Sequence, residues 1–135
     1  MKFAEINPTD DELRLTLEIG FLLRELGKFE EAAQIFRGAS KLIPESDVPL
    51  VGLGTVEFQQ RNFEAAHEAY EQALKIKPDS LYAKVHRAET RLFEGKRDQA
   101  ENELREIIAA NPESPHSRTA QALIDLADSI SPNLK

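Results

Sequence analysis

A period of 34 residues organises this chain and limits what it can fold into. Pro44, Pro78 and Pro112 are separated by 34 residues. Four further series keep the same phase: Ala32, Ala66 and Ala100; Phe36, Tyr70 and Leu104; Gly20, Gly54 and Ala88; Ala39, Ala73 and Ile107. A period of this length is typical of arrays in which each repeat buries its apolar face against its neighbours.

Each repeat predicts a helix, a tight turn and a second helix, because its apolar residues recur at helical spacing and alternating strand patterns are missing. Thr9 and Glu12 form a capping-box pattern for the first helix, and Gly27 marks its end. The second helix begins near Phe29 and stops before Pro44. Ser46 or Asp47 caps a helix over about 48–60, and a helix over 63–76 follows it. Asp79 or Ser80 opens a fifth helix that closes at Gly95, and a sixth runs to about residue 110.

A last helix is expected to cap the array, because a stacked array leaves its final helix with one face uncovered. Ser114 is its expected N-cap, with Pro115 in the first turn. Its apolar stripe consists of Ala120, Leu123, Ile124, Ala127 and Ile130, and Pro132 stops it.

The repeats resemble the tetratricopeptide repeat family, whose signature joins Leu-Gly, a later Ala-x-x-x-Phe and a final Pro. Gly20, Ala32, Phe36 and Pro44 match it in the first repeat. Gly54, Ala66, Tyr70 and Pro78 match in the second, and Ala88, Ala100, Leu104 and Pro112 in the third. The resemblance implies an all-α, right-handed superhelix of three helix-turn-helix repeats. Their expected bounds are 13–46, 47–80 and 81–114, after an arm over 1–12 and before a capping helix and tail over 115–135.

Composition excludes several classes of function. The net charge is −7, which disfavours a general nucleic-acid binder. There is no cysteine, no Walker loop and no Gly-x-Ser-x-Gly elbow. No long apolar run predicts a membrane span, so a cytoplasmic protein without membrane contact is expected. His67, His86 and His116 fall in separate elements and are interpreted as solvated surface residues. We therefore expect neither an enzyme nor a cofactor or metal site.

The segment VGLGTVEF at 51–58 contains two glycines one residue apart and raises the question of a phosphate loop. A dinucleotide fingerprint needs a third glycine three residues after Gly54, where Glu57 stands. Gly54 is in phase with Gly20 and Ala88, which predicts close helix packing. Gly52 has no counterpart in phase, and we expect it to face a binding groove where a partner segment approaches the backbone.

In the tetratricopeptide family the first helices of successive repeats line a concave surface, and the resemblance implies the residues that face it. The predicted groove consists of Leu17, Phe21, Val48, Val51, Gly52, Thr55, Phe58, Tyr82, Val85, Glu89 and Leu92. Leu17, Val51 and Val85 are equally compatible with ordinary core packing. The groove is apolar with polar edges, which suits an extended or helical segment with apolar anchors.

A basic stripe on the fifth helix has two interpretations. Lys84, Arg87 and Arg91 share one helix face. They form either a site for an acidic partner or, as we favour, a solvated face neutralised by Glu94, Glu101 and Glu103. The clamp that some family members use for a terminal carboxylate needs Lys, Asn and Arg at groove positions where this sequence has other residues.

Three repeats, a final helix and an acidic composition also resemble the class II chaperones of type III secretion, which hold translocator subunits before export. The run from Leu50 to Gly54 stands where those proteins carry a Gly-Leu-Gly or Gly-Leu-Ala run. The leading hypothesis is thus a chaperone or adaptor that holds another protein in its groove. The alternative is a structural protein that associates with itself, as a homodimer or a longer array, or bridges components of a complex.

Overall fold

The computed structural model describes residues 9–130, and within that range it consists of seven helices without a strand. The helices are α1 (Asp10–Glu25), α2 (Phe29–Leu42), α3 (Val48–Gln59), α4 (Phe63–Ile76), α5 (Leu81–Phe93), α6 (Arg97–Ala110) and α7 (Pro115–Ile130). The expected all-α fold is therefore confirmed.

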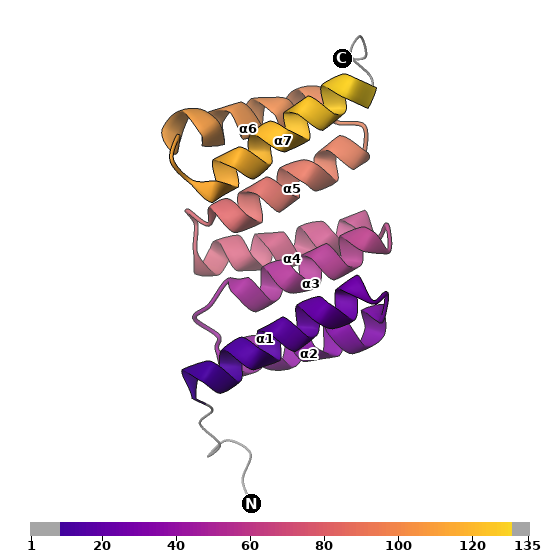
Figure 1. The fold of residues 1–135 in the computed structure, drawn as a ribbon, viewed down its shortest axis with the longest axis vertical. Coiled ribbons are helices and arrows are strands. Elements are labelled where there is room, and N and C mark those ends of the chain that lie inside the picture. Colours follow the sequence, from indigo (N-terminus) through magenta and orange to yellow (C-terminus); the bar gives the residue numbers. More distant parts are fainter. Residues whose placement is uncertain (1–8, 131–135) are drawn as a thin grey trace, which may run out of the picture.

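The helices form two layers along one long axis (Figure 1). Helices α1, α3, α5 and α7 make one layer, which we call the odd-helix layer, and α2, α4 and α6 lie behind it. Each helix packs on the next in sequence, and each odd helix also contacts the following odd helix. This is the superhelical stack that the 34-residue period predicts.

Predicted cap residues form hydrogen bonds at the starts of α1, α3 and α5. Thr9 and Glu12 form both hydrogen bonds of the capping box, which lowers the pKa of the Glu12 carboxyl through the Thr9 backbone N–H and hydroxyl. The Ser80 hydroxyl accepts from the Ala83 N–H at 3.1 Å. At α3 the Ser46 hydroxyl accepts from the Val48 N–H at 3.2 Å, whereas the Asp47 carboxylate accepts from the Ser80 hydroxyl at 2.6 Å.

The turns between paired helices need a left-handed residue, and two of the three use glycine. Gly27 has φ 76° and Gly95 has φ 84°. Arg61 occupies the same repeat position with φ 63°, a conformation that is unfavourable for a residue with a Cβ. The phase of the repeat therefore fixes the turn even where the sequence lacks its usual residue.

Each repeat junction is built around one large side chain of an even helix. Phe36 is fully buried, and its ring leaves no room for a Cβ at either Gly20 or Gly52, with approaches of 2.9 and 2.6 Å. Tyr70 is also fully buried and approaches Gly54 so closely that a Cβ there would lie 2.3 Å from the ring. The predicted packing role of Gly54 is thus confirmed.

The capping helix α7 covers the last repeat. The Ser114 hydroxyl accepts from the His116 N–H at 3.1 Å, near the expected cap. Ala120, Leu123 and Ile124 are buried with Leu104, whereas Ile130 is 71% exposed, so the apolar stripe is only partly covered. Pro132, the expected stop, lies outside the described residues.

Candidate functional site

The predicted groove residues all lie in the odd-helix layer, but four of the eleven are buried: Val51, Gly52, Thr55 and Val85. Val51 is fully buried beside Ala66 and Tyr70, and Val85 is 1% exposed in the cluster of the last repeat. Of the two alternatives for these valines, the structure favours core packing, because neighbouring helices already cover them. Leu17, the third residue of this group, is partly buried against the cluster around Phe36.

Gly52 is also not part of a groove floor. Its missing side chain makes room for the Phe36 ring, whose nearest atoms would lie 2.6 to 2.8 Å from an added Cβ. The expectation that a partner approaches the backbone at Gly52 is therefore wrong. The glycine is required by packing between α2 and α3, and the ring of Phe36 already occupies the space.

Seven of the predicted groove residues keep part of their surface exposed. Phe21 packs edge-on against Phe36, with ring centroids 4.9 Å apart, and Phe58 meets Phe93 at 5.1 Å. Phe93 is 51% exposed at the end of α5. The partly buried set consists of Leu17, Phe21, Val48, Phe58, Tyr82, Glu89 and Leu92. Aromatic rings therefore dominate the accessible apolar surface of α3 and α5.

A chain of rings crosses α7, α5 and α4. Tyr82 stacks on His116 with centroids 6.0 Å apart and meets His86 at 5.1 Å. His86 in turn stacks on Tyr70 at 6.5 Å, and its Nδ1 lies 3.1 Å from Glu89 Oε1. The interpretation of His86 as a solvated residue is wrong, because its ring packs between two tyrosines. It is wrong for His67 too, which is partly buried and lies 2.6 Å from Glu94.

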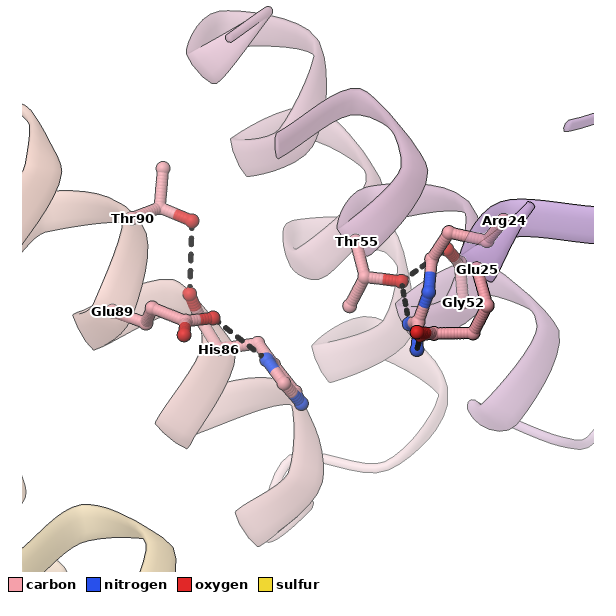
Figure 2. Close-up of polar contacts among 7 residues, drawn as sticks. All are labelled: Arg24, Glu25, Gly52, Thr55, His86, Glu89 and Thr90. Carbon is pink, nitrogen blue, oxygen red and sulfur yellow. Dashed lines mark hydrogen bonds and ion pairs between the residues drawn. The ribbon is translucent and has the colours of Figure 1, made fainter. Parts of the chain in front are cut away.

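Hydrogen bonds between polar side chains join α1 to α3 (Figure 2). Arg24 donates from Nη1 to Thr55 Oγ1 at 2.8 Å, and Thr55 donates to the Gly52 carbonyl at 2.7 Å. The other terminal nitrogen of Arg24 bonds to Glu25, and its guanidinium lies 5.2 Å from the Phe21 ring centroid. Thr55 is 3% exposed, so a predicted groove residue instead anchors Arg24.

Burial controls the titration of the two tyrosines. It raises the pKa of Tyr70 above the usual range for phenols, and the nearby Thr90 side chain offsets only part of this rise. It also raises the pKa of Tyr82, with Arg24 acting in the opposite direction and Asp47 in the same one. Both side chains therefore stay neutral at physiological pH and present rings and hydroxyl groups rather than charge.

The predicted basic stripe is largely neutralised within the fold. Arg91 pairs with Glu103, and Arg87 Nε lies 3.9 Å from the same carboxylate. Burial, followed by the nearby charge of Arg91, lowers the pKa of Arg87. Glu94 and Glu101, the other expected partners, bind His67 and Arg97 instead. The stripe is half-buried between α5 and α6 rather than a solvated face.

A pocket of about 610 Å³ opens where α3, α5 and α7 begin. Val48 and Tyr82 line it together with His116, Lys84 and Asp47. It joins the ring chain to charges of both signs at one edge of the odd-helix layer. Within residues 9–130, the pocket included, no group of three or more His, Asp or Glu side chains is placed to hold a metal ion.

The repeat signature and the helix pairs match a known family. Models described as tetratricopeptide repeat match residues 11–79 and residues 57–124. The chain belongs to the tetratricopeptide repeat family. Among its helices within the described range, none is both long enough and apolar enough to cross a bilayer.

Curated relatives and solved structures extend this comparison. The chain is 25% identical over 114 residues, 84% of its length, to the human DnaJ homolog subfamily C member 3, and it spans 23% of that protein. It is similar to the Yersinia enterocolitica type III secretion chaperone SycD, solved with a peptide of the translocator YopD. That match has TM-score 0.70 and 19% identity, and it covers 91% of this chain and 97% of SycD. For PcrH of Pseudomonas aeruginosa the TM-score is 0.74 and the identity 21%, with coverage of 94% and 98%.

Several residues of this surface were missed from the sequence, although the phase contains a signal for one of them. His116 follows Tyr82 by 34 residues, so it occupies the same repeat position on the next odd helix. Extending the period into the capping helix would have paired the two rings. His86 carries no comparable signal, because Gly52 stands one period before it.

Proposed function

We propose that this tetratricopeptide repeat protein holds an apolar segment of another protein against its odd-helix layer and acts as a chaperone or adaptor without catalysing a reaction. More specifically, we propose a cytoplasmic chaperone of the type III secretion kind, whose cargo is a translocator subunit. The absence of cysteine agrees with a reducing compartment.

The observation that carries this proposal is the match in size and fold to SycD and PcrH. This chain and each of those chaperones cover more than nine-tenths of one another. The same chain spans under a quarter of the DnaJ relative, in which the repeats are part of a longer protein. The matched residues of this chain thus correspond to nearly all of each secretion chaperone and to a small part of the DnaJ relative.

The chemistry of the surface supports a partner with apolar anchors. Phe58, Tyr82 and Phe93 offer partly accessible rings on adjacent odd helices. Arg24 on α1 and Glu89 on α5 add polar groups to the same layer, which suits hydrogen bonds to a peptide backbone. Rings supply large contact area with little loss of side-chain entropy, so they are effective anchors for an extended or helical segment.

The test is a calorimetric titration of the full chain with two synthetic probes, the YopD peptide and the chaperone binding region of PopD. We expect micromolar binding of at least one probe, with a negative heat-capacity change from apolar burial. Phe93→Ala should weaken that binding about tenfold, because a buried aromatic anchor is worth more than about 1.4 kcal/mol.

Leu42→Ala is the matched control. Leu42 is 50% exposed and lies on α2, in the other layer, whereas Phe93 is 51% exposed on α5. The two substitutions therefore remove similar apolar area from the two faces. Failure of the wild-type chain to bind either probe, or an equal loss in both variants, would contradict the proposed function.

A further inference from the structure

Two pockets meet at the start of α5, on the edge of the array where α3 and α7 also begin (Figure 1). One is the pocket of about 610 Å³ described above, and the other, of about 320 Å³, opens between α5 and α6. Leu81, Lys84 and Asn111 line both, so we call the two pockets together the Lys84 trough. Volumes of this size are typical of ligand sites.

Lys84 is partly buried in this trough and has no partner there. The other lysines of residues 9–130 are all exposed. The Lys84 ammonium makes no hydrogen bond or ion pair with any residue of that range. An ammonium group loses hydration when it is partly buried, and an opposite charge or hydrogen bonds normally compensate for that loss. The described part of the chain does not supply this compensation.

The repeat phase shows that packing does not require a lysine at this position. One period earlier stands Leu50, which packs against the cluster around Val51 and Tyr70. One period later stands Arg118, which is exposed. The repeat therefore accepts an apolar side chain here, and the stability of the array gives no reason for the charge of Lys84.

The acidic residues of the trough leave Lys84 available for another anion. They are Asp47, Asp79, Glu103 and Glu106, and none lies within ion-pair distance of Lys84. Asp47 is buried and accepts from the Ser80 hydroxyl at 2.6 Å, and Glu103 is paired with Arg91. The other two are exposed, so solvent screens their charge.

Hydrogen-bond donors and rings beside Lys84 suit a carboxylate that is next to an apolar group. The Asn111 amide donates to the Ile107 carbonyl at 3.1 Å, and its nitrogen carries a second N–H. The ring of His116 carries an N–H in every protonation state and stacks on Tyr82, with centroids 6.0 Å apart. The stacked pair therefore adds apolar surface on one side of the charge.

We propose that the Lys84 trough binds an acidic peptide segment in which an aromatic or large aliphatic residue is adjacent to an aspartate or glutamate. Lys84 pairs with the side-chain carboxylate, and the stack of Tyr82 and His116 receives the apolar neighbour. The inference rests on the proposed function, because it names the chemistry of the segment that the odd-helix layer holds. The trough is continuous with that layer, since Val48 and Tyr82 line it and also belong to the partly exposed groove set.

NMR titration of the isotope-labelled full chain with a pair of capped dipeptides tests the site. The probes are acetyl-Phe-Glu-amide and its neutral counterpart acetyl-Phe-Gln-amide, which differ in charge but have almost the same shape. We expect the Glu probe to shift the amide signals of Lys84 and Asn111. We also expect it to bind about threefold more tightly or better, because a hydrogen bond to a charged group is stronger than a neutral one. Equal affinity of the two probes would overturn the proposal.

Three variants test the role of the lysine. Lys84→Gln should abolish the difference between the probes. Lys96→Gln is the matched control, because it removes the same charge from an exposed position in the turn between α5 and α6. Lys84→Leu should also abolish the difference without lowering the melting temperature, since Leu50 occupies this repeat position. Loss of the difference in the Lys96 variant, or a lower melting temperature of Lys84→Leu, would overturn the proposal.

A third probe, acetyl-Phe-Gln with a free terminal carboxylate, distinguishes a side chain from a chain end. Binding as tight as that of the Glu probe would assign the trough to a terminus and overturn the assignment to an acidic side chain. The result is also separable from the titration with the YopD and PopD probes. A chain that binds either of those probes but does not discriminate between the dipeptides retains the proposed function and lacks the carboxylate site. Discrimination between the dipeptides without binding of YopD or PopD would support the site and contradict the proposed function.

Discussion

The first two repeat junctions solve the same packing problem with different residues. At the first, the Phe36 ring is covered by glycine on both sides, Gly20 and Gly52. At the second, the equivalent Tyr70 ring has Gly54 on one side and the ring of His86 on the other. His86 stands one period after Gly52, so one position alternates between no side chain and an aromatic ring.

The difference shows how a repeat protein places polar chemistry within a regular array. The first junction is apolar and tight. At the second, His86 places its Nδ1 3.1 Å from Glu89 Oε1, and Tyr70 adds a buried hydroxyl near Thr90 of α5. The polar groups of the proposed binding surface therefore lie at the second junction, where His86 replaces the glycine of the first.

The largest effect is expected from Gly52→Leu, which places a branched side chain where Phe36 already approaches to 2.6 Å. We expect it to lower the free energy of unfolding by about 3 kcal/mol, since overpacking displaces neighbours in a dense interior. Urea denaturation followed by circular dichroism measures the loss.

Two variants sharpen this result. Gly38→Leu adds the same side chain to α2, where a Cβ meets nothing within 4 Å, and it should not destabilise the fold. Combining Gly52→Leu with Phe36→Ala should recover part of the stability, because the new side chain enters the space of the lost ring. A stable Gly52→Leu chain would contradict the role given to the first junction.

At alkaline pH, ionisation of the Tyr70 hydroxyl at the second junction should lower the stability of the fold. Burial raises the pKa of Tyr70 in the folded chain, so above pH 10 the unfolded chain releases a proton that the folded chain retains. The contribution of Tyr70 to the free energy of unfolding is fully present below pH 10 and falls by about 1.4 kcal/mol per pH unit above it. Unfolding in urea between pH 9 and 11 should show a shallower decline for Tyr70→Phe than for the wild type.

Phe36→Tyr supplies the reciprocal measurement at the first junction. It introduces a hydroxyl into the apolar site between Gly20 and Gly52, and it should steepen the alkaline decline. Identical pH profiles for wild type and Tyr70→Phe would show that the hydroxyl of Tyr70 is no more buried in the folded chain than in the unfolded one.

The smallest expected effect on stability distinguishes Gly52, a junction glycine, from Gly38, which lies on an exposed part of α2. Gly38 lies within α2, is exposed and has free space around it. Gly38→Ala should raise the free energy of unfolding by about 1 kcal/mol, because alanine is the better helix former. Gly52→Ala should lower it despite the same gain in helix propensity. Thermal denaturation of the two variants compares them directly, and a shift in the same direction would contradict the distinction.

Periodicity was sufficient to predict the architecture. The 34-residue phase located the helix pairs, the close approach at Gly54 and the capping helix before any contact was known. It failed at Gly52 and left Val51 and Val85 undecided, because the choice between core and groove depends on which neighbouring helix covers a face. A single helix pattern contains no information on that choice, because core and groove both require apolar residues.

The sequence by itself determined the repeat, its turns and the family, since these depend on local spacing and on residues that only some backbone conformations accept. The tertiary structure decided which side chains remain available. Phe36 fills the space beside Gly52, Thr55 holds Arg24, and the rings of Tyr82 and His116 meet across two helices. These contacts depend on distances between helices, which are set by the packing of whole side chains.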